Sequence, residues 1–314
     1  MNDSQMITIA GQIGSGKTEV SRVLAQKTGR EMISTGVILR KMAAEYGVSV
    51  LELNDRAARN PEIDKEIDAH LKALYERPRP AIVDSRLGWH FIPSSFKAYL
   101  VVDPIIGAER VYSAIRPDEQ YTSIAAAAGN NLKRQKYENE RFWKLYSIKC
   151  EDWRNYDLVI DTSQTPPERI ADLILEEQKA PQNTAFERRP HCWLSPKRLI
   201  PTQNIRELAE PRAMEVYQSV HQAGFDKQKP IDIALFEGHF LIIDGHLRAS
   251  AALRTEMPLI PCNLRASEDE FVAGDMDVAK FALTSTFLSW IHAWEEAHQF
   301  RFKSYPGWLM VHQA

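Results

Sequence analysis

Residues 11–18 read GQIGSGKT, and this segment constrains the fold and the chemistry of the chain more than any other. It fits the pattern G-x-x-x-x-G-K-S/T of a phosphate-binding loop without a mismatch. An apolar run at residues 6–10 (MITIA) predicts a buried strand before the loop, and apolar residues at helical spacing after Thr18 predict a helix that ends at Gly29. Strand, glycine-rich loop and helix in this order predict an α/β fold with a parallel sheet.

The loop predicts a site for the phosphates of ATP, because its backbone N–H groups and the positive end of the following helix turn toward one point. Lys17 is expected to reach the β- and γ-phosphates, and the hydroxyl of Thr18 is expected to hold Mg²⁺. The alternative is a glycine-rich turn that binds no ligand. The expected ATP-binding residues are Gly11, Gln12, Ile13, Gly14, Ser15, Gly16, Lys17 and Thr18.

The chain has 314 residues, enough for about two domains, and 44% of them are hydrophobic, as in proteins that bury a core. Its formal net charge of −3 excludes a global basic field for nucleic acid but allows a local basic patch. We expect no membrane association, because no apolar run is long enough to span a bilayer and no leader opens the chain. The chain has no C-x-x-C pair among Cys150, Cys192 and Cys262, so we expect neither disulfides nor a zinc site. Free cysteines favour a reducing compartment, which is the cytoplasm, or the host cytoplasm if a phage encodes the protein.

From residue 1 to 178 the pattern alternates between strands and helices, which predicts a parallel sheet between helices. The expected strands are residues 6–10, 81–84, 98–102 and 158–161, and the expected helices include 37–46 and 61–75. Residues 179–195 lack periodicity and carry proline, asparagine and charge, so we expect a linker there.

A smaller α+β unit is expected at residues 196–266, and an aromatic-rich helical tail at residues 267–314. The elements expected in the unit are helices at 209–223 and 248–255 and strands at 230–235 and 240–244. In the tail, Phe287, Ile291 and Trp294 lie on an expected helix. Such a stripe either packs into a core or stacks on nucleic-acid bases, and the sequence leaves both alternatives open.

A carboxylate and an arginine follow the expected strand at residues 81–84. Asp84 ends that strand beside the phosphate loop, where α/β sheets bind ligands, so it can hold Mg²⁺ through water or bind an acceptor. Arg86 offers a planar fork that suits a phosphate. The alternative for Asp84 is the N-cap of a helix.

Arg134 and Arg141 lie seven residues apart with Glu138 between them, so an expected helix carries both arginines on one face. Two guanidinium groups on one face, in a region where a lid can form, suit the charge of a transferring phosphoryl group. The alternative is a solvated helix face with no role in chemistry.

Several ordered segments of residues 1–178 resemble the cytidylate kinase family, particularly its short archaeal branch. They are ITIAGQIGSGKT, ISTGVILRKMAAEYGVSVLELN, NPEIDKEIDAHL, VDSRLGW, RQKYENERFWKLYSI and YDLVIDTSQTPPERIADLI. The resemblance implies a P-loop kinase domain, ATP as the phosphate donor, Mg²⁺ as the cofactor and a CMP- or dCMP-like nucleotide as the acceptor.

The resemblance also implies roles for individual residues. The implied acceptor-binding residues are Ser34, Thr35, Gly36, Arg40, Asp84 and Arg86. The implied catalytic residues are Lys17, Asp84, Arg134 and Arg141. Ser85 stands where the family's acceptor signature has glycine. Residues 113–131 depart from the family's lid entry, so Arg110 and Arg116 receive no role.

Residues 240–253 read FLIIDGHLRASAAL, which predicts a strand, a tight turn and a helix. Asp244, Gly245, His246 and Arg248 predict a nucleotide or anion site at the N-terminus of that helix. His246 suits a capped turn equally well. Residues 196–264 resemble the ParB/sulfiredoxin-like superfamily, whose members bind CTP or use ATP, and the resemblance implies nucleotide handling or association with DNA.

Three hypotheses follow for the function. The first is an ATP-dependent kinase that phosphorylates a free pyrimidine nucleotide such as CMP or dCMP. The second keeps the chemistry but takes as acceptor a hydroxymethylated pyrimidine, such as 5-hydroxymethyluracil, in bacteriophage DNA during base hypermodification. The third is a nucleotide-switched regulator associated with DNA. The sequence does not specify the acceptor, the ligand of the second unit or the oligomeric state.

Overall fold

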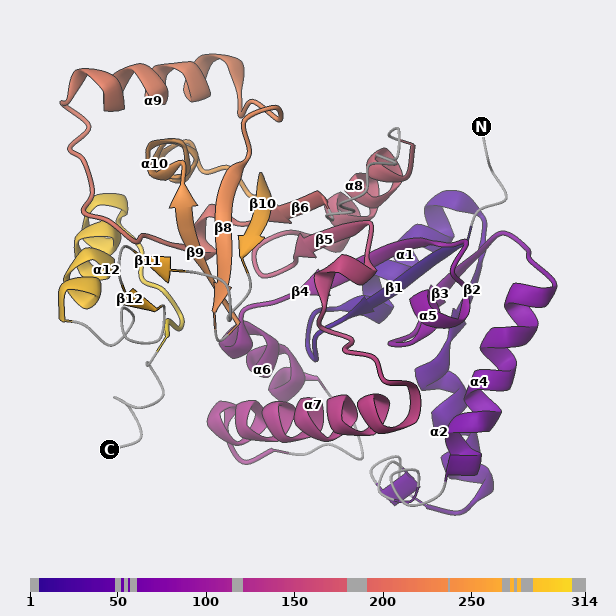
Figure 1. Cartoon of the computed structure of the whole chain (residues 1–314). Coiled ribbons are helices and arrows are strands. Elements are labelled where there is room, and N and C mark those ends of the chain that lie inside the picture. The colour runs from indigo at the N-terminus through magenta and orange to yellow at the C-terminus, as the bar shows by residue number, and fades with distance from the viewer. Residues whose placement is uncertain are drawn as a thin grey trace. The chain divides into compact units, whose positions relative to one another are not determined.

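The computed structural model describes residues 6–48, 52–53, 56, 61–114, 121–179, 191–236, 238–266, 272–273, 276–277 and 285–306. The chain forms two compact units, Met1–Arg188 and Arg189–Ala314 (Figure 1). None of the described helices is both long enough and apolar enough to cross a membrane.

The first unit is built on a parallel sheet with the strand order β2-β3-β1-β4-β5. The strands are β1 (Ile7–Gly11), β2 (Glu31–Ser34), β3 (Ala81–Asp84), β4 (Phe96–Val101) and β5 (Leu158–Asp161). Every residue of β1, β3, β4 and β5 is buried, as in parallel strands covered on both faces. In the register of β1 and β3, Ile9 lies opposite Asp84. The loop after β1 therefore begins close to the carboxylate that ends β3.

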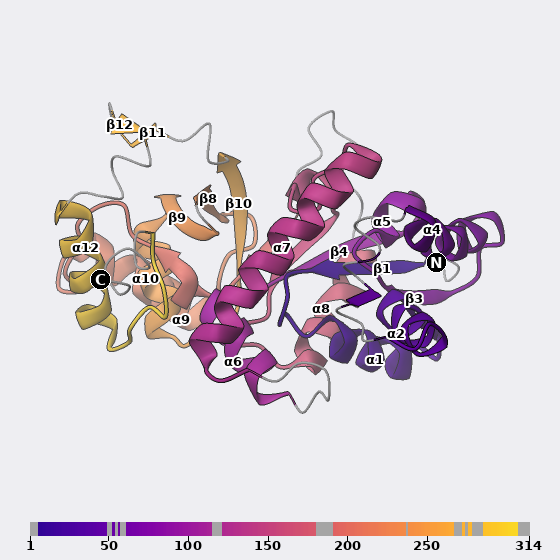
Figure 2. The same ribbon diagram turned by 90° about the horizontal axis from the view of Figure 1, so that it is seen from below.

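Helices cover both faces of this sheet. They are α1 (Lys17–Thr28), α2 (Thr35–Glu45), α4 (Pro61–Glu76), α5 (Gly88–Phe91), α6 (Pro104–Ser113), α7 (Ile124–Tyr146) and α8 (Pro167–Lys179), with a short 3-10 helix η1 (Trp153–Asn155). Figure 2 shows α1 and α8 on one face of the sheet and α5 and α7 on the other. The start of α6 is capped by the side chain of Asp103, which accepts hydrogen bonds from the N–H groups of Ile105 and Ile106.

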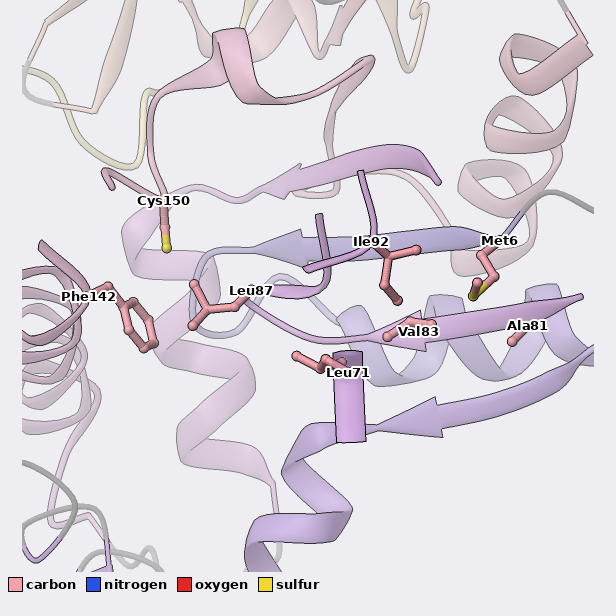
Figure 3. Packing of buried hydrophobic residues seen from close by; sticks show 8 residues of the cluster. All are labelled: Met6, Leu71, Ala81, Val83, Leu87, Ile92, Phe142 and Cys150. Atoms are coloured by element: carbon pink, nitrogen blue, oxygen red, sulfur yellow. The ribbon is translucent and has the colours of Figure 1, made fainter. Parts of the chain in front are cut away.

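A buried apolar cluster joins the sheet to α4, α5 and α7 (Figure 3). Its members are Met6, Leu71, Ala81, Val83, Leu87, Ile92, Phe142 and Cys150. Leu71 belongs to α4 and Phe142 to α7, so the burial of these side chains holds both helices against β3. The packing of Phe142 therefore also determines where the charged side chains on the same side of α7 lie.

The α/β class, the parallel sheet between helices and the helical region near the C-terminus are confirmed. The strand β2 was missed, because it lies at the edge of the sheet with Glu31 exposed, and no apolar run marks it.

The second unit contains a mixed sheet with the strand order β6-β10-β8-β9-β7. Its strands are β6 (His191–Leu194), β7 (Leu199–Ile200), β8 (Ile231–Phe236), β9 (His239–Asp244) and β10 (Ile260–Ala266). Its helices are η2 (Pro196–Arg198), α9 (Pro211–Ala223), α10 (His246–Arg254) and α12 (Ser285–His298). The sheet combines parallel pairs (β7 with β9, β8 with β10) and antiparallel pairs (β6 with β10, β8 with β9), and helices stand between the strands along this part of the chain.

The aromatic helix α12 packs against its own unit. Phe287, Ile291 and Trp294 are fully buried. At the end of the helix, Nε2 of His298 lies 2.7 Å from the hydroxyl of Ser250 on α10. These aromatic side chains build a core, so they do not form a platform for nucleic-acid bases.

One expectation for the second half of the chain was wrong in part. Residues 191–194, placed in the linker 179–195, form β6, because Cys192, Trp193 and Leu194 are buried in its sheet. The tail 267–314 was expected to be mostly helical, and α12 is its helix. The short antiparallel strands β11 (Val272–Ala273) and β12 (Met276–Asp277) precede α12. Residues 180–190 of the linker and 307–314 of the tail lie outside the described residues.

Candidate active site

The phosphate-binding loop connects β1 to α1 and is held by close backbone packing. A Cβ atom on Gly11 would lie 2.3 Å from the carbonyl oxygen of Leu100 in β4. A Cβ atom on Gly14 would lie 2.3 Å from the carbonyl oxygen of Gly107 in α6, and the φ of Gly14 is 79°. No larger residue fits either position without moving the backbone. The glycines thus set the loop against β4 and α6.

Two side chains tie the loop to its neighbours. Oε1 of Gln12 accepts a hydrogen bond from the N–H of Val102 at 2.8 Å. Arg110 on α6 donates to the carbonyl oxygen of Gly14 at 3.3 Å and to that of Thr162, just after β5, at 2.7 Å. The sequence assigned no role to Arg110, because nothing in its local pattern indicates contact with a loop so distant along the chain. Arg116 lies outside the described residues.

The helix α1 begins after Gly16, which is left-handed (φ 78°) and provides no side-chain cap. The N–H groups of the first turn therefore point toward the loop without a side-chain acceptor, and the helix dipole favours an anion there. Nζ of Lys17 donates to the carbonyl oxygens of Gly11 at 3.0 Å and Gln12 at 3.1 Å. An ammonium group has three donors, so Lys17 can add a phosphate oxygen to these contacts.

Asp84 joins the phosphate loop to the acceptor side of the sheet. Its Oδ2 accepts hydrogen bonds from the hydroxyls of Thr18 at 2.8 Å and Ser34 at 3.2 Å. Its carbonyl oxygen accepts one from the hydroxyl of Thr35 at 3.4 Å. The alternative role as a helix N-cap is wrong, because the N-cap of α5 is Leu87. One buried carboxylate is thus shared between the start of α1 and the start of α2.

The turn at the start of α2 contains the other expected acceptor residues. Ser34 is the N-cap of α2 and lies opposite Asp84 in the register of β2 and β3. Gly36 stands in the first turn, and Nη1 of Arg40 lies 3.7 Å from the place of a Cβ atom on Gly36. Arg40 is exposed and folds back toward the turn. The structure therefore brings Ser34 and Thr35 onto Asp84 and leaves Arg40 at the rim.

Glu138 on α7 binds two of the expected arginines. One of its oxygens pairs with Arg86, and the other accepts a hydrogen bond from Nε of Arg134 at 3.0 Å. Burial alone would raise the pKa of Glu138, but Arg86, Arg134 and Arg141 outweigh it and hold the pKa below its ordinary value. Glu138 therefore stays ionised and orients both guanidinium groups. The sequence placed Glu138 between the arginines without recognising this role.

The charged side chains around the loop form a cluster in which cations outnumber carboxylates. Burial and the nearby Arg86 lower the pKa of Lys17 to about 7, although Asp84 and Glu138 act in the opposite direction. Arg141 is half-buried, and its guanidinium lies 5.1 Å from the ring centre of Phe142. The inner face of α7, which carries Arg134, Glu138 and Arg141, is therefore not freely solvated. An excess of positive charge in a partly buried site favours a polyanionic ligand.

In the second unit, the side chains of the D-G-H-x-R turn bind groups of their own unit. Arg248 donates to the carbonyl oxygens of Lys229 and Pro230 and to Asp244. Nε2 of His246 accepts a hydrogen bond from the N–H of Thr202 at 3.1 Å, and burial lowers the pKa of His246 to about 4. The arginine fork therefore already has acceptors, and a nucleotide or anion site here stays a prediction.

Within the part of the chain that the structure describes, no three or more His, Cys, Asp or Glu side chains come together as a metal site. Any metal ion at the phosphate loop would therefore depend on phosphate oxygens and water for most of its ligands.

Comparison with known proteins places this site in a family. Residues 7–141 match a family described as AAA domain. A cytidylate kinase of Archaeoglobus fulgidus is 34% identical over 171 residues, which cover 54% of this chain and 92% of that protein. A protein of Lacinutrix mariniflava named S-adenosylmethionine-dependent nucleotide dehydratase is 31% identical over 238 residues, covering 70% of this chain but only 48% of that protein.

Among solved structures, sulfiredoxin from Arabidopsis thaliana matches 24% of this chain and 86% of its own length, with 21% sequence identity and a TM-score of 0.21. The ParB/sulfiredoxin-like assignment of the second unit stays a prediction.

A strand, a phosphate-binding loop with its lysine, a helix and a partly buried group of arginines define a P-loop phosphotransferase. The protein is an ATP-dependent phosphotransferase, and through its first unit the chain belongs to the cytidylate kinase family.

Proposed function

We propose that the first unit transfers the γ-phosphate of ATP to a pyrimidine nucleoside monophosphate such as CMP or dCMP. The observation that carries the proposal is the carboxylate of Asp84, which accepts hydrogen bonds from Thr18 on the donor side and Ser34 on the acceptor side. One buried group thereby aligns the two halves of a transfer site. The kinship with cytidylate kinases supports the choice of acceptor.

The residues at the loop fit a magnesium ion. Mg²⁺ is commonly held through one or two protein oxygens together with phosphate oxygens and water. Thr18 and Asp84 offer a hydroxyl and a carboxylate that lie 2.8 Å apart. When bound, the ion would neutralise charge that develops on the β- and γ-phosphates. Thr18 would face the ion directly, and Asp84 would hold the hydroxyl and any water on the ion.

The protein's own contribution is positioning and charge. The backbone of the loop and Lys17 would bind the β- and γ-phosphates, and Arg134 and Arg141 would face the transferring group. Arg86 and Arg40 would bind the phosphate of the acceptor. Because Glu138 already fixes Arg86 and Arg134, little reorganisation is needed when charge develops.

The direct test incubates the full-length protein with labelled ATP, Mg²⁺ and a panel of CMP, dCMP, UMP and AMP. We expect a labelled diphosphate from CMP or dCMP at a kcat/KM well above that for AMP. A protein that hydrolyses ATP at the same rate with and without every monophosphate, and that labels none of them, would contradict the proposal.

A second candidate acceptor is a pyrimidine in DNA, and the outer face of α7 favours it. Tyr137 and Trp143 are 68% and 55% exposed, and both lie on this face. The face also carries the exposed lysines Lys133, Lys136 and Lys144. Exposed rings beside lysines suit a single strand, whose bases stack and whose phosphates attract cations. A ParB-like second unit would suit the same substrate, a hydroxymethylated pyrimidine in DNA included.

This candidate is tested by binding and by transfer. The protein would bind a pyrimidine-rich single strand with an affinity that falls steeply with salt, and Trp143→Ala would weaken binding without changing transfer to CMP. Transfer to an oligonucleotide that contains 5-hydroxymethyluracil would establish the activity. Equal binding by wild type and Trp143→Ala, with no labelled oligonucleotide, would reject it.

A further inference from the structure

We propose that Glu151 is a positioning residue of the transfer reaction, because it holds α7 through Gln135 and thereby sets the place of Arg134. The proposal rests on the proposed function in one respect, since it assumes that Arg134 faces the transferring phosphoryl group. Glu151 lies between two of the segments that resemble cytidylate kinases and belongs to neither of them.

The contact that carries the proposal joins α7 to the chain segment that follows it. Nε2 of Gln135 donates a hydrogen bond to Oε1 of Glu151, sixteen residues later, and both side chains are half-buried. A carboxylate acceptor makes such a bond stronger than one between two neutral groups. Gln135 directly follows Arg134 and lies three residues before Glu138, so the bond holds α7 at the level of both charged side chains.

Glu151 can hold a helix because its own segment is fixed on both sides. On one side, Cys150 is buried in the apolar cluster shown in Figure 3, and its carbonyl oxygen accepts a hydrogen bond from the hydroxyl of Tyr156 at 2.7 Å. On the other side, Asp152 caps the 3-10 helix η1 by accepting a hydrogen bond from the N–H of Arg154 at 3.0 Å. The carboxylate of Glu151 therefore stands on a rigid base.

Glu151 also lies close to the charged side chains of the active site. Burial raises the pKa of Tyr99 in β4, and the negative charge of Glu151 adds to this effect, whereas the positive charge of Arg86 opposes it. Glu138, the partner of Arg86, acts on Tyr99 in the same direction as Glu151. These charged groups therefore gather around one buried tyrosine, and the contact that holds α7 is close to the arginines that the helix presents.

The helix α7 is thus held at two places by two different parts of the chain. Glu138 binds Arg86, which follows β3, and Gln135 binds Glu151, which precedes β5. Two contacts restrict the rotation of a helix more than one contact does. Arg134 is therefore in place before charge develops on the transferring group, which is the condition for electrostatic stabilisation without reorganisation. A small misplacement of such a group lowers turnover more than it lowers the binding of ATP.

The first experiment removes the bond from either end. Glu151→Ala should lower kcat for transfer to CMP roughly three- to tenfold, the scale of one partly exposed hydrogen bond to a charged group. The KM for ATP should stay within about twofold, because the phosphate loop and Lys17 are unchanged. Gln135→Ala should give the same result. Glu140→Ala, at an exposed position of the same helix, is the matched control and should leave kcat unchanged.

The second experiment exchanges the two partners. Gln135→Glu alone sets two carboxylates against each other and should lower kcat at least as much as Glu151→Ala does. Combined with Glu151→Gln, it restores an amide and a carboxylate in exchanged places with the net charge of the wild type. The double variant should recover a kcat within about threefold of the wild-type value. A double variant that is no more active than Gln135→Glu would overturn the proposal.

A third experiment distinguishes action through Arg134 from a purely structural role. In the background of Arg134→Ala, Glu151→Ala should cause no further loss of kcat, because the group that Glu151 positions is absent. A purely structural role would lower kcat by the same factor with and without Arg134, in step with a lower melting temperature, and that result would reject the proposal.

Two measurements without an acceptor separate this proposal from the proposed function. Glu151→Ala should speed hydrogen exchange of the amides in residues 124–146 and slow the transfer of the γ-phosphate of ATP to water, and the exchanged pair should reverse both effects. If these effects appear but no monophosphate is phosphorylated, the proposed acceptor is wrong and the positioning role stands. If CMP is phosphorylated but Glu151→Ala changes neither exchange nor hydrolysis, the proposed function stands and the positioning role is rejected.

Discussion

At the scale of single residues, the site depends on a few side chains that each serve two neighbours. Lys17 binds two carbonyl oxygens of its own loop and is placed to bind a phosphate as well. Asp84 accepts hydrogen bonds from a hydroxyl group on each side of the transfer site. Removing either residue should therefore affect chemistry far more than folding.

Lys17→Ala should lower kcat at least about a hundredfold, the scale of losing one preorganised charge at a transition state. The measurement is steady-state transfer to CMP at saturating ATP. Lys27→Ala is the control, because Lys27 lies at the far end of the same helix in an exposed ion pair with Asp172. Near wild-type transfer by Lys17→Ala would falsify the assignment of the phosphate loop.

The binding of ATP should depend on pH through Lys17. Without nucleotide, burial and Arg86 hold the pKa of Lys17 at about 7, below its ordinary value of 10.5. Phosphate oxygens favour the charged form, so the bound state keeps a proton that the free state loses as pH rises above about 7. Affinity for ATP should thus fall from about pH 7 to about pH 9, with proton uptake on binding.

Calorimetry at about pH 8 in two buffers of different ionisation enthalpy measures this uptake directly. Lys17→Arg keeps its charge throughout this range and should show no uptake. The same group makes the nucleotide-free protein more stable as pH rises from about 7 to 10.5, because the unfolded lysine still holds the proton. An affinity for ATP that stays constant over this pH range would show that Lys17 is already charged before binding.

At the scale of elements, α7 decides the geometry of the arginines. Its inner face carries Phe142 into the apolar cluster and Glu138 onto Arg86 and Arg134. The same helix thus supplies both the packing that fixes its position and the charges that meet the substrate. A change at Glu138 should therefore appear in both stability and catalysis.

Glu138→Gln should destabilise the unit by roughly 2 kcal/mol, less than the 3–5 kcal/mol of a fully buried pair, because Arg86 and Arg134 keep some exposure. It should also raise the KM for the acceptor, since both arginines lose their orienting carboxylate. Thermal unfolding and transfer kinetics check the two effects. Glu140→Gln, at an exposed position of the same helix, should change neither.

The contribution of Glu138 also depends on pH. Its pKa is lowered in the folded protein, so its stabilisation is present above the ordinary pKa of 4.5 and is lost as pH falls through the folded value. The wild type should therefore lose stability relative to Glu138→Gln in acid. If the wild type and Glu138→Gln lost the same free energy of unfolding as the pH falls, Glu138 would not be ionised in the folded state.

Much of the fold was predictable from local pattern, whereas several contacts at the site were not. The strands β1, β3 and β5 are short apolar runs, and the phosphate loop carries its own spacing, so both could be read from sequence. The bond between Ser34 and Asp84 depends on the register of β2 and β3, which pairs residues fifty positions apart. Local periodicity carries no information about such a register.

Charge pairs show the same limit. The pattern placed Arg134 and Arg141 on one face, but it did not show that Glu138 would hold Arg86 from a different element. The position of Arg110 against Gly14 likewise depends on how α6 packs on the loop. Helical spacing gives the neighbours of a residue within its helix, while partners from other elements follow from tertiary packing.

At the scale of the whole molecule, the chain joins a phosphotransferase unit to a second compact unit. The match to the Archaeoglobus fulgidus cytidylate kinase covers 92% of that protein with 54% of this chain. The first unit therefore contains nearly the full length of that relative. We expect the second unit to supply a substrate or a signal, and to be dispensable for the chemistry itself.

Truncation after residue 188 separates these two roles of the second unit. If the second unit acts as a regulator, the truncated protein should phosphorylate CMP with a kcat/KM within about threefold of the full-length value, because every residue of the proposed transfer site lies in the first unit. If the second unit delivers nucleic acid, the same truncation should abolish transfer to an oligonucleotide while transfer to CMP persists. Arg248→Ala complements the truncation. Since Arg248 holds the carbonyl oxygens of Lys229 and Pro230, this change should lower the stability of the second unit without lowering turnover of CMP. Loss of CMP phosphorylation in the truncated protein, despite a cooperative thermal transition, would mean that the second unit contributes a group to the reaction itself.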